Sequence, residues 1–282
     1  MIEVLKPGLF STIQDLGRFG YQQFGVPFSG VMDRKATKLA NSLLGNNMND
    51  AVIEMTMIGV ALEFNCQTLI CISGADMSPK LNDIPVSNHK VITVRPKDVL
   101  TFGKLINGFR TYLAVLGGLK TELSMNSRSM YKGISERAHI IKGDYLEIED
   151  FNGLSSDKNA VLKVNTNYII NQDIEVFKGP EFDLLSAKQQ SKLVNNNFTI
   201  SNTNNRMAYQ LNESFENNLD AIITAPVLPG TVQLTPSGKL IVLMRDCQTT
   251  GGYPRVLQLK KSAINVLSQK FSGNTIVFRL IN

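Results

Sequence analysis

With 282 residues, the chain has the length of one large domain or of two domains of ordinary size. Its hydrophobic content of 43% is enough for buried cores, but no apolar run approaches the ~20 residues that a membrane-spanning helix needs. The net charge of +5 comes from scattered lysines and lacks the basic stripe typical of nucleic-acid binding. The first residues, MIEVLKPG, contain no apolar signal-peptide core. We therefore expect a cytoplasmic protein without nucleic-acid or membrane partners.

Cysteine and histidine are too few and too scattered to indicate a metal site. The three cysteines, Cys66, Cys71 and Cys247, form no CxxC pair, and His89 and His139 lie far apart in the sequence. Cys66 and Cys71 flank a short apolar run, which favours buried thiols. We expect no bound metal.

Short β-type runs dominate the chain and are separated by turns rich in Gly, Pro, Asn and Asp, a pattern typical of barrels and sandwiches. The predicted strands span residues 68–73, 91–94, 99–102, 110–115, 145–148, 161–164, 174–177, 198–201, 231–234, 240–244, 255–259 and 275–280. Helical periodicity is convincing only over 33–44, 183–194 and 260–271. So few helices argue against a regular alternation of strands and helices.

The predicted domain boundary lies in the polar, turn-rich segment 150–171, near residue 155. A group of strands and at least one helix lie on each side of it. We therefore expect an N-terminal domain over residues 1–155 and a C-terminal domain over residues 156–282.

A loop rich in glycine and polar residues precedes the first predicted helix, which Asp33 can cap at its start. The loop carries Asp15, Arg18 and Tyr21, and binding groups commonly lie on loops that a rigid scaffold holds. If the loop lines a cleft, Arg18 can hold a carboxylate by a two-pronged hydrogen bond. In the alternative, Asp15 and Arg18 pair with each other, which on an exposed surface is worth about 0–1 kcal/mol. Tyr21 would then be a packed residue with a solvated hydroxyl.

A second motif, residues 204–209, follows the strand predicted over 198–201. Its Arg206 suits an anion or a substrate carboxylate, with Asn205 beside it. The alternative is an exposed arginine in an asparagine-rich loop.

A third motif runs from Asp246 to Pro254, between two predicted strands. It presents a carboxylate, an amide, two hydroxyls and the N–H groups of a glycine pair, which together can orient a planar amide or a carboxylate. The alternative is a hairpin turn that Asp246 caps. The other candidates in this motif are Gln248, Thr249, Thr250, Gly251, Gly252 and Tyr253.

Several motifs with known chemistry are missing from the sequence. There is no G-x-x-x-x-G-K-[ST] phosphate loop, and the segment 236–239 lacks its upstream glycine. No Ala-Met-Lys-Met type sequence occurs, so we expect no biotin attached to this chain. The lack of a G-x-S-x-G elbow and of a histidine within a motif argues against a Ser–His–Asp hydrolase.

Three stretches in order resemble the allophanate hydrolase subunit 2 family. They are IQDLGRFGYQQFGVPFSGVMDRKATKLANSLLGN with the later Glu54 and Gly59, the motif at 204–209, and residues 229–256. This family includes the C subunit of bacterial 5-oxoprolinase, the carboxyltransferase part of urea carboxylase and a sporulation-control protein. The resemblance covers nearly the whole chain. It implies a mainly β fold of two packed cyclophilin-like β-barrel domains with a few short helices.

A further stretch, residues 127–129, resembles another motif of the family and implies a substrate-binding role for Arg128. The chain departs from the family pattern near it. Asn126 stands where a small residue is usual, and residues 132–137 stand where a glycine-rich run is usual. In the second motif, Ala208 replaces a usual glycine.

The leading hypothesis from this resemblance is the C subunit of an ATP-dependent 5-oxoprolinase, an amide hydrolase that opens 5-oxoproline to glutamate. It would act with a B-like protein and the A subunit of that enzyme, and the complex would use ATP at a site that the sequence does not place. Arg18 and Arg206 would bind anions, and Asp246 would act as a general base or orient the substrate. The expected substrate-binding residues are Asp15, Tyr21, Arg128, Asn205, Tyr209, Gln248, Thr249, Thr250, Gly251, Gly252 and Tyr253.

Two alternatives stay open. The first is a biotin-dependent carboxyltransferase acting on urea or a related amide, with the biotin carrier and biotin carboxylase on other chains. The second is a non-catalytic regulatory protein of the same family, in which the departures at Asn126 and Ala208 reflect lost catalysis. A neighbouring gene for a biotin carrier would favour the first, and a neighbouring gene for the A-type partner would favour the oxoprolinase.

Overall fold

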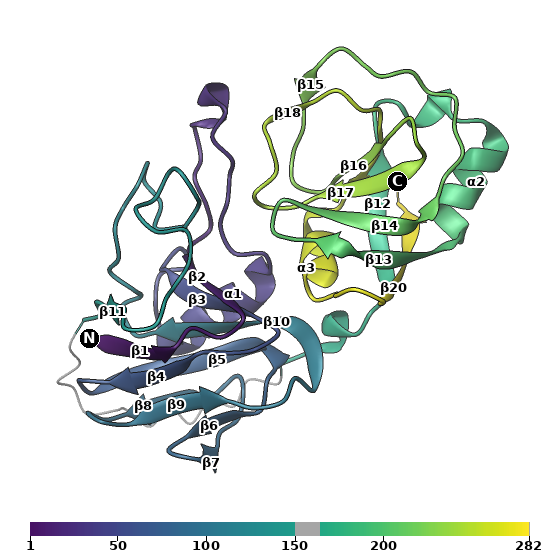
Figure 1. Ribbon diagram of the computed structural model, residues 1–282. Coiled ribbons are helices and arrows are strands. Elements are labelled where there is room, and N and C mark those ends of the chain that lie inside the picture. The colour runs from purple at the N-terminus through teal and green to yellow at the C-terminus, as the bar shows by residue number, and fades with distance from the viewer. Residues whose placement is uncertain (150–163, 282) are drawn as a thin grey trace. The chain divides into compact units, whose positions relative to one another are not determined.

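The computed structural model describes residues 1–149 and 164–281, and this part is mainly β with three short α-helices (Figure 1). The chain divides into two compact units, unit 1 with Met1–Gly17 and Asp33–Ile170 and unit 2 with Arg18–Met32 and Asn171–Asn282. The segment Arg18–Met32 therefore belongs to unit 2, although unit 1 flanks it in the sequence. The boundary expected near residue 155 lies outside the described residues. So does the expected strand 161–164, except for Val164, which lies in no strand.

Unit 1 contains two sheets. The six-stranded sheet has the order β11 (Tyr145–Leu146), β1 (Ile2–Lys6), β4 (Ala61–Phe64), β9 (Val99–Phe102), β6 (Pro79–Leu81) and β7 (Ile84–Pro85). The five-stranded sheet has the order β2 (Phe10–Gln14), β3 (Val52–Thr56), β10 (Asn107–Val115), β5 (Thr68–Asp76) and β8 (Val91–Val94). A 3₁₀ turn, η2 (Asn167–Ile169), also belongs to this unit.

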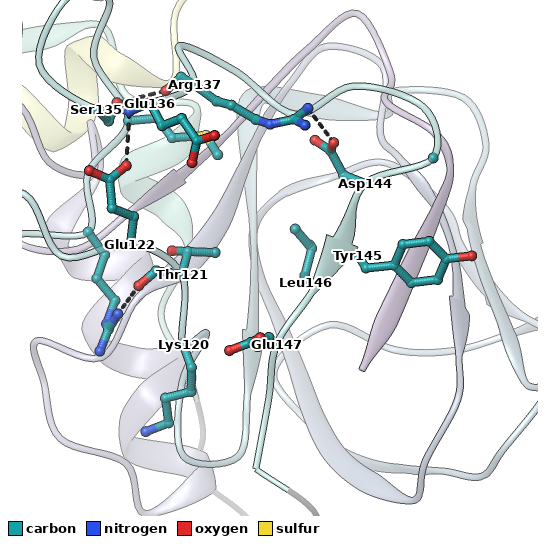
Figure 2. Close-up of a pocket in the computed structure, with 13 residues that line it drawn as sticks. Lys120, Thr121, Glu122, Ser135, Glu136, Arg137, Asp144, Tyr145, Leu146 and Glu147 are labelled. Atoms are coloured by element: carbon teal, nitrogen blue, oxygen red, sulfur yellow. Dashed lines mark hydrogen bonds and ion pairs between the residues drawn. The ribbon is translucent and has the colours of Figure 1, made fainter.

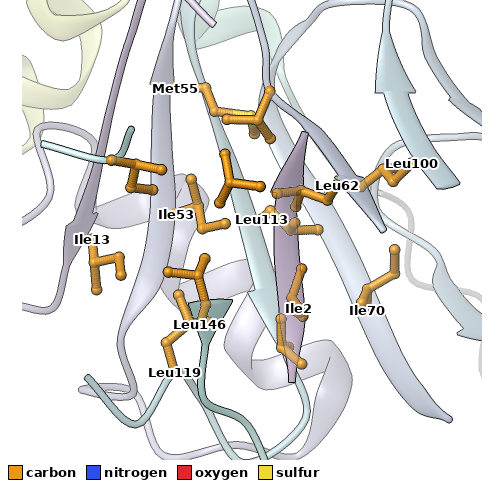
Figure 3. Packing of buried hydrophobic residues seen from close by; sticks show 14 of the residues in the cluster. Ile2, Ile13, Ile53, Met55, Leu62, Ile70, Leu100, Leu113, Leu119 and Leu146 are labelled. Atoms are coloured by element: carbon orange, nitrogen blue, oxygen red, sulfur yellow. The ribbon is translucent and has the colours of Figure 1, made fainter. Parts of the chain in front are cut away.

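The two sheets of unit 1 share one hydrophobic core (Figure 3). Ile2 and Leu62 come from the first sheet, Ile53 and Leu113 come from the second, and all four are fully buried. Full burial of each such side chain stabilises the fold by about 1.5–3 kcal/mol. This core fixes the register of both sheets, because a shift by one residue would turn these side chains to the opposite face.

The helix α1 (Arg34–Leu44) packs against β5 and β10 of unit 1. The Asp33 side chain accepts hydrogen bonds from the backbone N–H groups of Lys35 and Ala36, both at 3.0 Å. Gly45 ends the helix in the left-handed conformation at φ 77°. The helix and the cap that the sequence predicts over 33–44 are therefore confirmed.

Unit 2 is built around a closed barrel, which leaves no unpaired sheet edge. Its strand order is β12 (Asp173–Lys178), β19 (Arg255–Leu259), β16 (Thr231–Leu234), β17 (Lys239–Leu243), β14 (Ala208–Ser214), β13 (Asn197–Asn204) and β20 (Thr275–Leu280). A parallel pair, β20 with β12, closes the ring, and the other pairs are antiparallel. Two very short strands, β15 (Ala225–Pro226) and β18 (Thr250–Gly251), form a separate ribbon. The remaining elements are η1 (Gln22–Phe24), η3 (Phe182–Leu184), α2 (Ala187–Asn195) and α3 (Lys261–Ser268).

The predicted mainly β, barrel-containing fold with few short helices is confirmed, but two helix boundaries are wrong. The helix expected over 183–194 begins only at Ala187, because Ser186 forms a capping box with Gln189. The helix expected over 260–271 ends at Ser268. No helix in the described part of the chain has the length and apolar character needed to cross a membrane.

Candidate functional site

The carboxylate of Asp15 lies at the centre of a buried hydrogen-bond cluster in unit 1. Its Oδ1 accepts from the hydroxyls of Ser127 and Ser129, both at 2.7 Å, and from the N–H of Gly17 at 2.8 Å. Its Oδ2 accepts from the backbone N–H of Arg128 at 2.7 Å. Asp15 is only 3% exposed, so these four donors take the place of water around its charge. We call these five residues the Asp15 cluster.

The Asp15 cluster joins the end of β2 to the motif at 127–129, which follows 112 residues later in the sequence. Both carboxylate oxygens are engaged, and they hold the backbone of the motif. This geometry supports a positioning role for Asp15, because its carboxylate holds the backbone at Arg128 in place. The substrate-binding role expected for Asp15 stays a prediction.

The side chain of Arg128 lines a pocket of about 440 Å³ in unit 1 (Figure 2). Its guanidinium donates to the backbone carbonyl of Thr121. Leu146, which belongs to the hydrophobic core, contributes an apolar part of the lining. Arg137 pairs with Asp144 across another wall of the pocket. The pocket thus combines an apolar surface with fixed charges, as small-molecule sites do.

Asp33 is a structural cap in a buried network of unit 1. Its Oδ2 accepts from the hydroxyl of Tyr168 at 2.8 Å, and its N–H donates to the hydroxyl of Tyr112 at 2.8 Å. Burial and the charge of Asp33 raise the pKa of Tyr168 far above its usual range. Burial, with the charges of Glu54 and Asp33, does the same to the pKa of Tyr112. Both phenols therefore remain protonated, so the hydroxyl of Tyr168 remains a donor to Asp33 at all ordinary pH values.

The structure brings Arg206 and Asp246 together within unit 2. The Nε of Arg206 donates to Oδ2 of Asp246 at 2.8 Å, and its Nη2 donates to Oδ1 at 3.1 Å. Nη2 also donates to the backbone carbonyl of Gly30 at 2.6 Å. The Arg206 and Asp246 side chains are only 7% and 12% exposed, so the pair is largely shielded from water. The alternative of an exposed loop arginine at position 206 is therefore wrong.

This two-pronged pair limits what either residue can do alone. Two N–H groups of the Arg206 guanidinium already donate to Asp246. An anion that binds Arg206 must therefore share the guanidinium with this carboxylate or displace it. Each oxygen of Asp246 retains a second lone pair, through which it can orient a donor group of a ligand. The two residues are best treated as one unit.

The segment from Asp246 to Pro254 is not a simple hairpin turn. The flanking strands β17 and β19 both pair with β16, so they do not pair with each other. Inside the segment, β18 pairs with β15 instead. The alternative of a hairpin turn capped by Asp246 is therefore wrong, and the segment is a longer excursion that carries its own ribbon.

The two other candidate residues of the second motif, Asn205 and Tyr209, make hydrogen bonds that hold the local backbone. Tyr209 is fully buried, and its hydroxyl donates to the carbonyl of Lys270 at 3.2 Å. The side-chain oxygen of Asn205 accepts from the N–H groups of Met207 and Ala208, at 2.8 and 3.1 Å. This Asx-type turn shapes the approach to Arg206.

Of the loop residues before α1, Arg18 and Tyr21 belong to unit 2, whereas Asp15 belongs to unit 1. Arg18 is fully buried, and its N–H donates to the carbonyl of Phe28 at 2.6 Å. The half-buried Tyr21 precedes η1, and its carbonyl accepts from the N–H of Phe24 at 3.0 Å. On the third motif, the side chain of Tyr253 is 41% exposed.

One candidate was missed by sequence reasoning. Gln233 on β16 is 2% exposed and its amide lies against Gly251 of the third motif. Nothing in the local pattern of β16 distinguishes this glutamine from an ordinary polar strand residue. The only indication in the sequence is the glycine at position 251, which contacts Gln233 in the fold. The backbone of Gly251 is not in the left-handed conformation that would itself require glycine.

The cysteines and acidic groups do not assemble into a metal site within the part of the chain that the structure describes. No group of three or more His, Cys, Asp or Glu side chains there could hold an ion. Cys71 and Cys247 are buried, as expected for Cys71, and burial raises the pKa of each thiol to about 12. Cys66 is only partly buried, so the expectation of a buried thiol is wrong at this position.

Comparison with known proteins identifies the family of the chain. Residues 24–280 match the family model described as carboxyltransferase domain, subdomain A and B. The whole chain is similar to the C subunit of 5-oxoprolinase from Haemophilus influenzae, with 32% identity over 292 aligned positions and 92% of that protein covered. It is also similar to the C subunit of 5-oxoprolinase from Escherichia coli, with 30% identity over 284 positions, and it covers 90% of that protein.

The fold is shared with solved structures of longer proteins. The Kluyveromyces lactis urea amidolyase aligns with the whole chain at 26% identity and a TM-score of 0.84, and the chain spans 19% of it. A second solved chain aligns at a TM-score of 0.85, and 55% of its length is spanned. At 22% identity, that likeness shows the fold alone.

Proposed function

The chain belongs to the family of carboxyltransferase domains, subdomains A and B, and on that premise we propose that it is the C subunit of an ATP-dependent 5-oxoprolinase. The observation that carries this proposal is the similarity over the full chain to the C subunits of two 5-oxoprolinases, at 32% and 30% identity. We propose partners of the A and B type, which the same similarity supports. The reaction hydrolyses the ring amide of 5-oxoproline to glutamate, while ATP is hydrolysed to ADP and phosphate.

The chemistry of this reaction suits the groups gathered in unit 2. An amide is a poor electrophile, so its hydrolysis needs a substrate held in a fixed position and hydrogen bonds to its carbonyl oxygen. We assign substrate positioning to the Arg206–Asp246 pair, with Asp246 orienting a donor group and Arg206 holding Asp246 in place. Within unit 2, Arg18 is the further candidate for the substrate carboxylate. The substrate-binding role expected for Arg128, which lies in unit 1, is a separate prediction. ATP is a co-substrate of the complex, and we assign no nucleotide site to this chain.

The test is a reconstitution of the chain with its genomic A-type and B-type neighbours. ATP hydrolysis and glutamate release are measured with and without 5-oxoproline. Oxoproline-dependent turnover is expected for the natural sequence and is expected to fall by roughly a hundredfold in Asp246→Asn, if this carboxylate acts in the transition state. Arg279→Gln, at an exposed ion pair with Asp173, is the matched control and should retain turnover.

Two results would contradict the proposal. A complex that assembles but releases no glutamate would remove the oxoprolinase function. Full turnover in a folded Asp246→Asn variant would remove Asp246 from the site. A chain that binds its B-type partner tightly and supports no reaction would favour the regulatory alternative.

Carboxyl transfer is the second candidate, and the family description and the likeness to a urea amidolyase favour it. In that reaction, the carboxyl group moves from carboxybiotin, carried on another chain, to urea or a related amide. The same assay decides between the two candidates when a carboxylated biotin carrier and urea replace ATP and 5-oxoproline. Consumption of carboxybiotin that depends on urea would establish the transferase.

A further inference from the structure

The side-chain Nε2 of Gln233 is buried in unit 2 and has no hydrogen-bond partner among the described residues. The residue is 2% exposed, and its Nε2 donates to no atom of residues 1–149 or 164–281. Leaving such a donor unpaired costs about 1–3 kcal/mol. Native proteins keep very few groups of this kind, so each one needs an explanation.

The position of Gln233 shows which segment covers it. Val232 and Leu234, its neighbours on β16, are fully buried hydrophobic residues, and Gln233 points to the opposite face of the strand. There its Nε2 would lie 2.5 Å from a Cβ at Gly251, with a methyl of Val227 at 3.4 Å. The ribbon of β15 and β18 therefore lies over the amide.

A side chain at position 251 would have to displace this amide. Its backbone is not in the left-handed region, so the conformation would tolerate a side chain. The space would not, since a contact of 2.5 Å is far inside normal van der Waals distance. Gly251 thus leaves room for the Gln233 amide in its present position, where the Nε2 makes no hydrogen bond with the described protein atoms.

The third motif, Asp246 to Pro254, contains a second amide atom without a hydrogen bond in the described parts of the chain. The Oε1 of Gln248 is buried and accepts no hydrogen bond within the described parts of the chain. Gln233 thus supplies an unpaired donor and Gln248 an unpaired acceptor, and a planar amide carries the complementary C=O and N–H. The ribbon that covers Gln233 has only two residues in each strand, and ribbons so short are marginally stable.

We propose that Gln233 is a substrate-binding residue that recognises the carbonyl oxygen of an amide through its side-chain N–H when the β15–β18 ribbon lifts. This inference deepens the proposed function and rests on it for the identity of the amide, 5-oxoproline. Gln233 lies in the stretch 229–256, but the residue itself was not among the candidates that the sequence offered.

The test compares the same substitution at two glutamines on neighbouring strands. Gln258 on β19 is satisfied, because it accepts from Thr231 at 2.8 Å and donates to the carbonyl of Pro229 at 3.1 Å. Gln258→Met should therefore lower the free energy of unfolding. Gln233→Met removes an unpaired donor and keeps the volume, so it should leave the unfolding midpoint unchanged or raise it. It should also weaken turnover or binding of 5-oxoproline by about tenfold or more, the value of one well-made hydrogen bond.

Stability and binding together decide the proposal. Destabilisation of Gln233→Met to the extent seen in Gln258→Met would show a structural amide and overturn it. Full turnover in a stable Gln233→Met variant would overturn it as well. If the natural chain shows no oxoprolinase activity, the proposed function fails by itself, and binding of 5-oxoproline and urea is then titrated by NMR. Loss of that binding in Gln233→Met supports the proposal, whereas equal binding, or no binding of either amide to the natural chain, overturns it.

Discussion

Arg206 and Asp246 share two hydrogen bonds in a largely shielded place, so the loss of either partner leaves a charge without its counterpart. Such an uncompensated charge costs about 3–5 kcal/mol. We therefore expect Arg206→Ala and Asp246→Ala each to destabilise the chain strongly, and the double variant to lose much less than the sum. Urea unfolding of the four proteins measures this coupling.

The exposed pair of Arg279 and Asp173 is the control for that cycle. Its side chains are 51% and 50% exposed, and such pairs contribute about 0–1 kcal/mol. The corresponding variants should unfold at nearly the natural midpoint. Simple additivity at Arg206 and Asp246 would mean that the two side chains do not depend on each other in solution.

Asp15 provides a second prediction for a single side chain. Asp15→Asn keeps one acceptor oxygen but places an NH₂ group where hydrogen-bond donors now converge. Hydrogen bonds to charged groups contribute about 1.5–3 kcal/mol each. We therefore expect Asp15→Asn to lower the free energy of unfolding by an amount in that range or above. Asp220→Asn, at an exposed position, should change nothing. Equal unfolding curves for the two variants would remove the anchoring role of Asp15.

At the level of elements, the β15–β18 ribbon predicts opposite outcomes for two adjacent glycines. A Cβ at Gly251 would meet Gln233 at 2.5 Å, whereas at Gly252 the nearest atom is the carbonyl oxygen of Ile222 at 3.6 Å. Gly251→Ala should destabilise by about 1–3 kcal/mol through overpacking. Gly252→Ala should be neutral or stabilising by about 0.4–1 kcal/mol.

The same Gly251→Ala substitution in a Gln233→Ala background tests whether the Gln233 amide causes the clash. With the amide removed, the 2.5 Å contact is gone, and a methyl group at position 251 meets Val227 at 3.4 Å, an ordinary van der Waals distance. Gly251→Ala should then cost little beyond Gln233→Ala itself, as measured by thermal unfolding. An equal cost in both backgrounds would place the clash elsewhere.

The sequence predicts some elements well because their signal is local. β8, β9, β16, β19 and β20 have the bounds that their runs of β-branched and apolar residues predict. β2 and β3 were missed, because buried polar side chains interrupt their apolar pattern. Gln14 donates to the carbonyl of Met130 at 3.1 Å, and Glu54 lies 3.8 Å from the Nε of Arg110. Partners so distant in sequence leave no local trace.

For the candidate site too, the sequence indicates the residues but not the contacts between them. The motifs draw attention to Asp15, Arg206 and Asp246 as residues. Their pairings span 112 positions from Asp15 to Ser127 and 40 from Arg206 to Asp246, and residue type alone does not reveal them. Gln233 was missed for the same reason, since only its contact with Gly251 marks it.

At the scale of the whole molecule, the cysteines provide an independent probe of each unit. Cys71 lies in unit 1 and Cys247 in unit 2, and burial raises the pKa of each thiol to about 12. Because the thiolate is the reactive form, both should resist a thiol reagent up to pH 9, and Cys66, which is partly buried, should react first. One fast-reacting thiol in native protein and three in urea are expected by mass spectrometry. Rapid native labelling of Cys247 would show that its unit opens readily.

The place of Arg18–Met32 in the chain has a consequence for synthesis. The carbonyl of Gly30 accepts a hydrogen bond from Arg206, 176 residues later. At ribosomal rates of about 5–20 residues per second, the two are made roughly 10–35 s apart. During that interval unit 1 can fold before the rest of unit 2 has been made. Phe19 and Phe24 lie in the early segment Arg18–Met32, and their side chains are 55% and 71% exposed even in the finished protein. A chain cut near residue 155 would separate unit 2 from this segment permanently, so the two halves of the gene do not encode the two units.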